Sequence, residues 1–196
     1  MPNLLPADPV RRGRIKLLAL AAFFAVPVVA GYIAYFFALA PGSAANYGTL
    51  IPAQPLSDTP LKALDGRPFS FSELRGKWAL VQFDSGACAA YCERKLYFMR
   101  QVRKALGKDM TRVERVWLLN DSEAPGARLL DAIEGTRLAR TRGTAFAAGF
   151  PAERTPVDHI YLVDPHGNLM MRFPRDPDPS RMLKDLQRLL KVSGIG

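Results

Sequence analysis

Cysteine and histidine are both scarce in this sequence. Its 196 residues contain two of each, and the two cysteines, Cys88 and Cys92, lie four positions apart. A closed structural zinc site needs four protein ligands. The two cysteines and one histidine could supply three, and no fourth ligand is evident. The sequence also lacks internal repeats and any recognised nucleic-acid-binding motif, and its basic residues are dispersed. We therefore expect no nucleic-acid partner, despite a net charge of +9.

The composition is that of a folded protein with one long apolar segment. Hydrophobic residues make up 48% of the chain and charged residues 23%, which excludes wholesale disorder. The segment Leu17–Ala40 contains no charged residue, and the chain beyond it is long enough for one domain with a proper core. The net charge is +3 before this segment and +6 after it, an excess that suits anionic lipid head groups or an acidic partner.

The apolar segment predicts a membrane anchor. Its length is sufficient to cross the hydrocarbon layer as a helix, and basic residues precede it, so residues 1–16 are expected to stay in the cytoplasm. We predict a single-pass protein of a bacterial inner membrane, with a transmembrane helix at 17–40, a tether at 41–60 and a periplasmic domain at 61–196. A cleaved signal peptide is the alternative, because Ala38–Ala40 resembles a small-residue cleavage site.

Beyond the tether, strand-like and helix-like patterns alternate, as in a mixed α/β fold. The apolar run Trp78–Asp84 predicts a buried central strand, and the apolar period after Ala89 predicts a helix that stops at Gly107. Other patterns predict hairpins at 61–64/68–71 and 160–164/168–173, strands at 113–119 and near 138, and helical segments at 127–134, near 146 and at 179–190. The cysteine pair thus falls where a strand gives way to a helix.

The spacing of the cysteines leaves several uses open. On a regular helix, residues four apart have Cβ atoms about 5–6 Å apart, wider than the ~3.5–4.5 Å that a disulfide prefers. If Cys88 lies in the loop before the helix, a disulfide or a shared metal ion becomes feasible. Helix N-terminal amides with Arg94 and Lys95 would favour the thiolate, and Asp84 is a candidate for exchanging protons with the thiols. A permanent disulfide closing so short a loop would stabilise weakly, so redox or metal chemistry is favoured over a structural staple.

Five motifs occur in order between Leu61 and Leu190: Asp65-Gly66, Glu73–Trp78, Cys88-x-x-x-Cys92, Val157-Asp-His159 and Tyr161–Gly167. Together they resemble the thioredoxin superfamily and, within it, the Sco (SenC) family of membrane-anchored cytochrome oxidase assembly proteins. Glu93 stands where that family usually has proline, so the chain is similar to a divergent branch. The resemblance implies a thioredoxin-like sandwich, in which helices flank a central mixed sheet.

The resemblance also implies a function. Sco proteins bind one copper ion through two cysteines and a histidine, and deliver it to the dinuclear copper site of cytochrome c oxidase or reduce its thiols. Carried over, the Cu(I) ligands are Cys88, Cys92 and His159, a donor set that suits this soft ion, whereas His166 falls in a turn and is expected to be exposed. The implied partners are the copper-bearing subunit of a respiratory oxidase and a periplasmic thiol donor.

The alternative is a thiol–disulfide oxidoreductase that carries no copper. In that case Cys88 attacks a partner disulfide, and Cys92 resolves the mixed intermediate.

Overall fold

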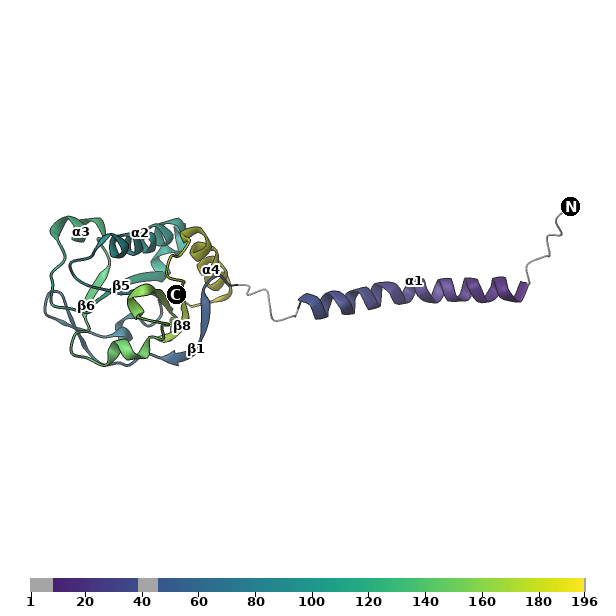
Figure 1. The fold of residues 1–196 in the computed structure, drawn as a ribbon, viewed down its shortest axis with the longest axis horizontal. Helices are drawn as coiled ribbons and strands as arrows, with labels where there is room; N and C mark the ends of the chain where they lie inside the picture. Colours follow the sequence, from purple (N-terminus) through teal and green to yellow (C-terminus); the bar gives the residue numbers. More distant parts are fainter. Residues whose placement is uncertain (1–8, 39–45, 196) are drawn as a thin grey trace. The chain divides into compact units, whose positions relative to one another are not determined.

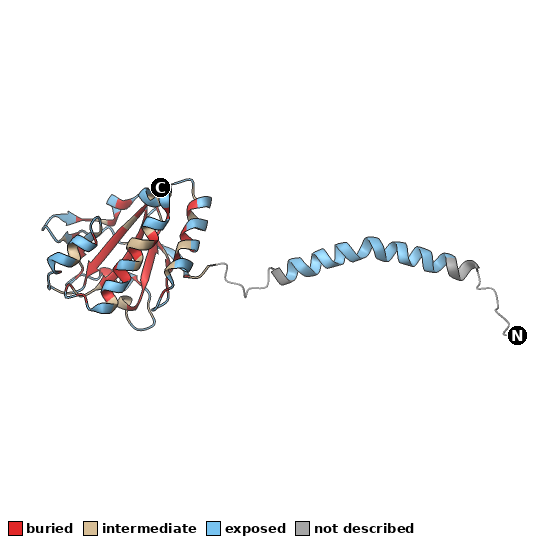
Figure 2. Cartoon of the chain, turned by 90° about the horizontal axis from the view of Figure 1, so that it is seen from above, coloured by how far each residue is buried: buried red, intermediate tan, exposed pale blue. Residues whose placement is uncertain are grey.

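The computed structural model describes residues 9–38 and 46–195, which fall into two units. The first unit is helix α1 (Pro9–Ala38), whose residues 13–36 are exposed (Figure 2). The span at residues 13–36 contains an 18-residue window with a mean hydropathy of 2.3 and is long enough to cross a membrane. The chain therefore carries an N-terminal apolar helix of the kind found in membrane anchors and signal sequences. The last two positions of the predicted span, 39 and 40, lie outside the described residues.

The second unit is built on one mixed sheet of eight strands, in the order β1-β8-β7-β4-β5-β6-β2-β3 (Figure 1). The strands are β1 (Thr49–Pro55), β2 (Leu61–Ala63), β3 (Pro68–Phe69), β4 (Trp78–Asp84), β5 (Val113–Leu119), β6 (Arg137–Arg140), β7 (Ile160–Val163) and β8 (Asn168–Arg172). Strands β4, β5 and β6 run parallel, and β7 and β8 are antiparallel to their neighbours. The predicted hairpins and strands are confirmed, and the apolar run forms the central strand β4.

Helices cover one face of this sheet. Helix α2 (Ala90–Ala105) contacts α4 (Pro179–Val192), and the two lie side by side in Figure 1, with the shorter α3 (Ala127–Ala132) beyond α2. The carboxylate of Asp178 caps α4 by accepting bonds from the backbone N–H groups of Ser180 and Arg181. The core beneath these helices contains alternate residues of β4 and β7. These residues are Trp78, Leu80, Ile160 and Leu162.

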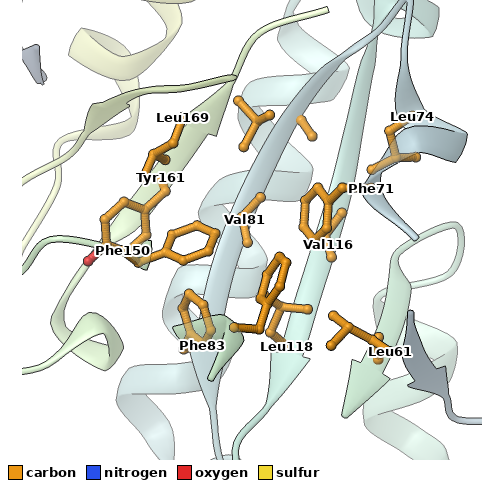
Figure 3. Close-up of a cluster of buried hydrophobic side chains, with 14 of the residues drawn as sticks. Leu61, Phe71, Leu74, Val81, Phe83, Val116, Leu118, Phe150, Tyr161 and Leu169 are labelled. Carbon is orange, nitrogen blue, oxygen red and sulfur yellow. The ribbon is translucent and has the colours of Figure 1, made fainter. Parts of the chain in front are cut away.

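Short 3₁₀ helices and loops cover the opposite face. Figure 3 shows the cluster there, in which Val81 and Phe83 of β4 pack with aromatic side chains such as Phe150 and Tyr161. Because successive side chains of a strand point to opposite faces, Gln82 and the other even-numbered residues of β4 face α2. This alternation decides which side chains surround the cysteines.

The predicted tether is wrong in part. Positions 41–45 lie outside the described residues, but Thr49–Pro55 forms strand β1, paired with β8, so the folded unit begins at Asn46 rather than at 61. The prolines of this segment suggested a linker. They are tolerated because β1 is the edge of the sheet and its register with β8 is irregular between Leu50 and Gln54.

Candidate functional site

The two cysteines form a disulfide at the junction of β4 and α2, with Cα atoms 5.1 Å apart. Cys92 lies in the first turn of α2. Cys88 precedes the helix, and among the described residues it alone has a positive φ, of 42°, without being a glycine. This backbone conformation turns the chain so that the Cys88 side chain approaches Cys92, which a regular helix would not allow. Cys88 thus lies in the loop before the helix, the placement that makes a disulfide feasible.

Burial distinguishes the two sulfurs. Cys92 is 1% exposed and Cys88 4%, and both pack against Trp117 and Ile133. Cys88, however, is flanked by the exposed small residues Ala87 and Ala89, whereas Cys92 is held between the helix and the sheet. Cys88 is therefore the sulfur that a partner molecule can approach.

Gln82 lies directly behind the disulfide. It is fully buried in β4, its Nε2 donates to the Cys92 sulfur at 3.8 Å, and its Oε1 has no hydrogen-bond partner. A disulfide sulfur can only accept, so the amide oxygen stays unsatisfied while the bond is intact. A Cys92 thiol would supply an S–H donor and a thiolate a better acceptor. Gln82 therefore favours the reduced form of the pair.

Substitution Gln82→Leu is expected to stabilise the disulfide relative to the dithiol. An unsatisfied buried carbonyl costs about 1–3 kcal/mol, so its removal should shift the equilibrium with glutathione about tenfold toward the disulfide. That shift lowers the reduction potential by about 30 mV. Equilibration in glutathione buffers measures it, with Gln187→Leu on the exposed face of α4 as the matched control. An unchanged or higher potential in Gln82→Leu would contradict the role given to Gln82.

A buried ion pair adjoins the cysteines on the same face. Lys95 is 1% exposed, and its Nζ lies 3.0 Å from Asp84 Oδ2, 3.2 Å from the Phe83 carbonyl oxygen and 2.5 Å from that of Val157. Burial lowers the pKa of Lys95, and the charge of Asp84 opposes that change. Asp84 thus pairs with an ammonium group whose donors are all engaged. The effects of Lys95 and Asp84 on the thiols stay predictions.

His159 lies on the other side of the sheet from Cys92. Its ring packs beside that of Tyr161, on the face of the sheet opposite the helices, with ring centroids 5.9 Å apart. Its Nδ1 is 2.8 Å from the Phe173 carbonyl oxygen. Among the described residues, no group of three histidine, cysteine or acidic side chains is arranged to hold a metal ion. The structure brings Cys88 and Cys92 together but leaves His159 apart. The three-ligand copper site stays a prediction, and His166 is exposed as expected.

The backbone before His159 is nevertheless fastened to α2. Lys95 bonds to the Val157 carbonyl oxygen, and the Tyr91 hydroxyl donates to that of Asp158 at 2.9 Å. Burial raises the pKa of Tyr91 to about 12, so this hydroxyl remains a donor at neutral pH. The segment that ends in His159 is thus held against the cysteine-bearing helix through its main chain.

Sequence reasoning gave no role to Gln82 and assigned Lys95 a different one. A signal for both was present. Gln82 is a polar residue inside an otherwise apolar strand, and Lys95 falls on the apolar stripe of its helix. Polar residues at core positions require buried partners. Lys95 has three, and Gln82 has one, the Cys92 sulfur.

The mixed sheet, its flanking helices and the cysteine pair at the β4–α2 junction define a thioredoxin-like domain. A family model described as "Transmembrane-like, thioredoxin-like, C-terminal domain" matches residues 78–193. This match covers more than half of the chain, and the protein belongs to that family. A search of curated proteins gave no match.

Solved structures with the same fold include Sco proteins and thiol–disulfide oxidoreductases. Apo Sco1 from Thermus thermophilus has a TM-score of 0.59 at 22% identity, covering 74% of this chain and 96% of its own. Copper-bound ScoI from Bradyrhizobium japonicum has a TM-score of 0.53 at 21% identity, covering 69% and 99%. The thioredoxin domain of a thiol–disulfide oxidoreductase from Bacteroides vulgatus has a TM-score of 0.50 at 17% identity, covering 73% and 96%. At these identities the likeness establishes the fold.

Proposed function

We propose that the chain is a membrane-anchored thiol–disulfide oxidoreductase that reduces cysteine pairs of client proteins. The observation that carries this proposal is the Cys88–Cys92 disulfide at the β4–α2 junction, with Cys88 on the approachable side. Gln82 lies behind Cys92 and is placed to tune the reduction potential of this pair.

The exchange proceeds in two balanced steps. The Cys88 thiolate attacks one sulfur of the client disulfide, forming a mixed disulfide and releasing one client thiolate. Cys92, as thiolate, then attacks the Cys88 sulfur, which releases the second client thiolate and closes the Cys88–Cys92 bond. Two electrons pass from the chain to the client, and a thiol donor in the same compartment restores the dithiol.

The proposed location follows from the N-terminal helix. The apolar helix α1 anchors the chain in a bacterial inner membrane, and the basic residues before it keep residues 1–16 in the cytoplasm. The folded unit from Asn46 onward then works in the periplasm, where client disulfides form.

The test uses the full chain in detergent micelles, reduced and freed of reductant under anaerobic conditions. Mixed with a peptide that contains one disulfide, it is expected to release two peptide thiols for each Cys88–Cys92 bond formed. Thiol titration with mass spectrometry of both species measures this stoichiometry. Peptide reduction no faster than by an equal concentration of a simple dithiol would contradict the proposal.

Copper delivery to a respiratory oxidase is the second candidate function. Side chains of α2 bond to the backbone of Val157 and Asp158, and His159 is the next residue along the chain. The shared fold with copper-bound ScoI also favours this function. Two of the three predicted ligands, the cysteines, fit a Cu(I) cargo. His159 would have to release the Phe173 carbonyl oxygen and change faces. The client would be the copper-bearing oxidase subunit.

Cu(I) titration of the reduced chain against a chromophoric chelator tests this candidate. A three-ligand site predicts one tightly bound Cu(I). Its affinity should fall at least about tenfold in His159→Ala, because one of the three ligands is lost. The matched control is His166→Ala, which alters an exposed turn and should leave the affinity unchanged. Equal affinities in both variants would remove His159 from the site.

A further inference from the structure

A hollow between α2 and α3 opens beside the disulfide. It has a volume of about 370 Å³, and its lining includes Ala90, Tyr97, Leu129 and Ile133. Ile133 is 4% exposed and packs in the same cluster as both cysteines, so the floor of this hollow belongs to the core that surrounds the disulfide. The mainly apolar lining suits the side chains of a peptide better than a free small ion.

A second, smaller hollow adjoins the first, because Arg100 lines both. Its volume is about 160 Å³, and four cationic residues converge on it: Arg100, Arg103, Lys104 and Arg115. Asp131 and Glu134 also line it, so the cations exceed the acids by two. No salt bridge in the described part of the chain involves any of these four cations.

Arg115 indicates that this hollow is built for an anion. Its side chain is buried in β5, 4% exposed, and Nη2 donates to the Glu134 carbonyl oxygen at 2.6 Å. Its Nε and Nη1 are buried without a hydrogen-bond partner. Burial and the nearby charges of Arg103 and Arg100 lower the pKa of Arg115. A guanidinium held in this way lacks an acceptor, and a carboxylate would supply two oxygens.

We propose that these two hollows form one docking groove for the client, which binds an extended segment with an acidic side chain in the hollow at Arg115. The inference rests on the proposed exchange function, since it places the client disulfide at Cys88. Cys92 is bonded to Cys88, and Arg103 lines the hollow at Arg115, so the two mark the ends of the groove on α2. The distance between them along the helix is about 16 Å, at 1.5 Å per residue. An extended chain covers that distance in about five residues, so the acidic residue lies about five positions from the attacked cysteine.

Two matched peptides test the groove. Each carries a disulfide loop and arms of five residues that end in glutamate in one peptide and in glutamine in the other. We expect the full chain in detergent to reduce the glutamate peptide with a kcat/KM about tenfold higher, because a charge-assisted bond to a buried guanidinium is gained. Arg115→Met and Arg100→Gln should both abolish the preference, whereas Lys184→Gln on α4, with the same loss of charge, should retain it.

Two further measurements separate this proposal from the exchange function. Reduction of a small uncharged aromatic disulfide should be equal in all variants, because it does not need the groove. Binding of the same peptides with serines in place of cysteines, followed by fluorescence anisotropy, should show the same tenfold preference without any exchange. Equal binding and equal kcat/KM for the two peptides, or a preference that persists in Arg100→Gln, would overturn the groove whether or not the chain exchanges disulfides.

Discussion

Substitution Cys88→Ser is expected to reduce disulfide exchange to the uncatalysed background. Cys88 is the sulfur bordered by exposed residues, and a serine hydroxyl at neutral pH is neither ionised nor able to form a disulfide. Cys92→Ser should behave differently. It should complete the first step at close to the wild-type rate and then stop, because nothing resolves the mixed disulfide. Single-turnover kinetics with a disulfide-bonded peptide, and mass spectrometry of the trapped adduct, measure both outcomes.

The contrast between the two variants assigns the roles of the two sulfurs. A mixed disulfide that accumulates on Cys88→Ser instead of Cys92→Ser would reverse the assignment. Retained turnover in Cys88→Ser would exclude this exchange mechanism. Because both cysteines are largely buried, each variant should first be shown to unfold at a denaturant concentration similar to that of the reduced wild type.

Substitution Lys95→Met is expected to destabilise the folded unit by about 3–5 kcal/mol. It leaves the carboxylate of Asp84, only 14% exposed, without its cation, and removes the donor from the Phe83 and Val157 carbonyl oxygens. Breaking a buried pair by removing one partner typically has a cost of this size. Denaturant unfolding of a fragment from Asn46 onward, which contains the whole sheet and its cores, measures the change.

The double variant Lys95→Met/Asp84→Asn is the control for this prediction. Removing the second charge should recover a large part of the lost stability, because no unpaired carboxylate remains. Additive effects of the two substitutions would show that the ion pair contributes little and that the loss comes from packing or from the two carbonyl bonds.

Much of the fold could be predicted from local patterns. The apolar run at β4, the three-to-four residue period of α2 and the Asp178-Pro179 start of α4 each express a preference of nearby residues, and each matches its element. The turn sequences around Gly66 and Gly167 likewise gave the two hairpins, and both glycines have the positive φ that such turns use. The cysteine spacing at a strand–helix junction predicted where the chemistry lies.

Pairings between distant segments could not be predicted in this way. Strand β1 joins β8 more than 100 positions along the chain, and its prolines resemble those of a linker until the edge of the sheet is known. The face of the sheet taken by His159 depends on the register of β7, because a shift of one residue reverses every side chain. The hollow at Arg115 depends on how α2 and α3 pack over β5.

The sequence by itself thus determined the apolar helix, the order of strands and helices, and the position of the two cysteines, because these depend on residues close together in the chain. Only the tertiary structure decided that Gln82 lies beneath the cysteine-bearing helix and that Lys95 pairs with Asp84. It also decided that His159 lies across the sheet and that four cations line one hollow at α2, α3 and β5. The physical reason is that burial and charge pairing depend on which distant segments meet, and strand pairing and helix packing set those contacts.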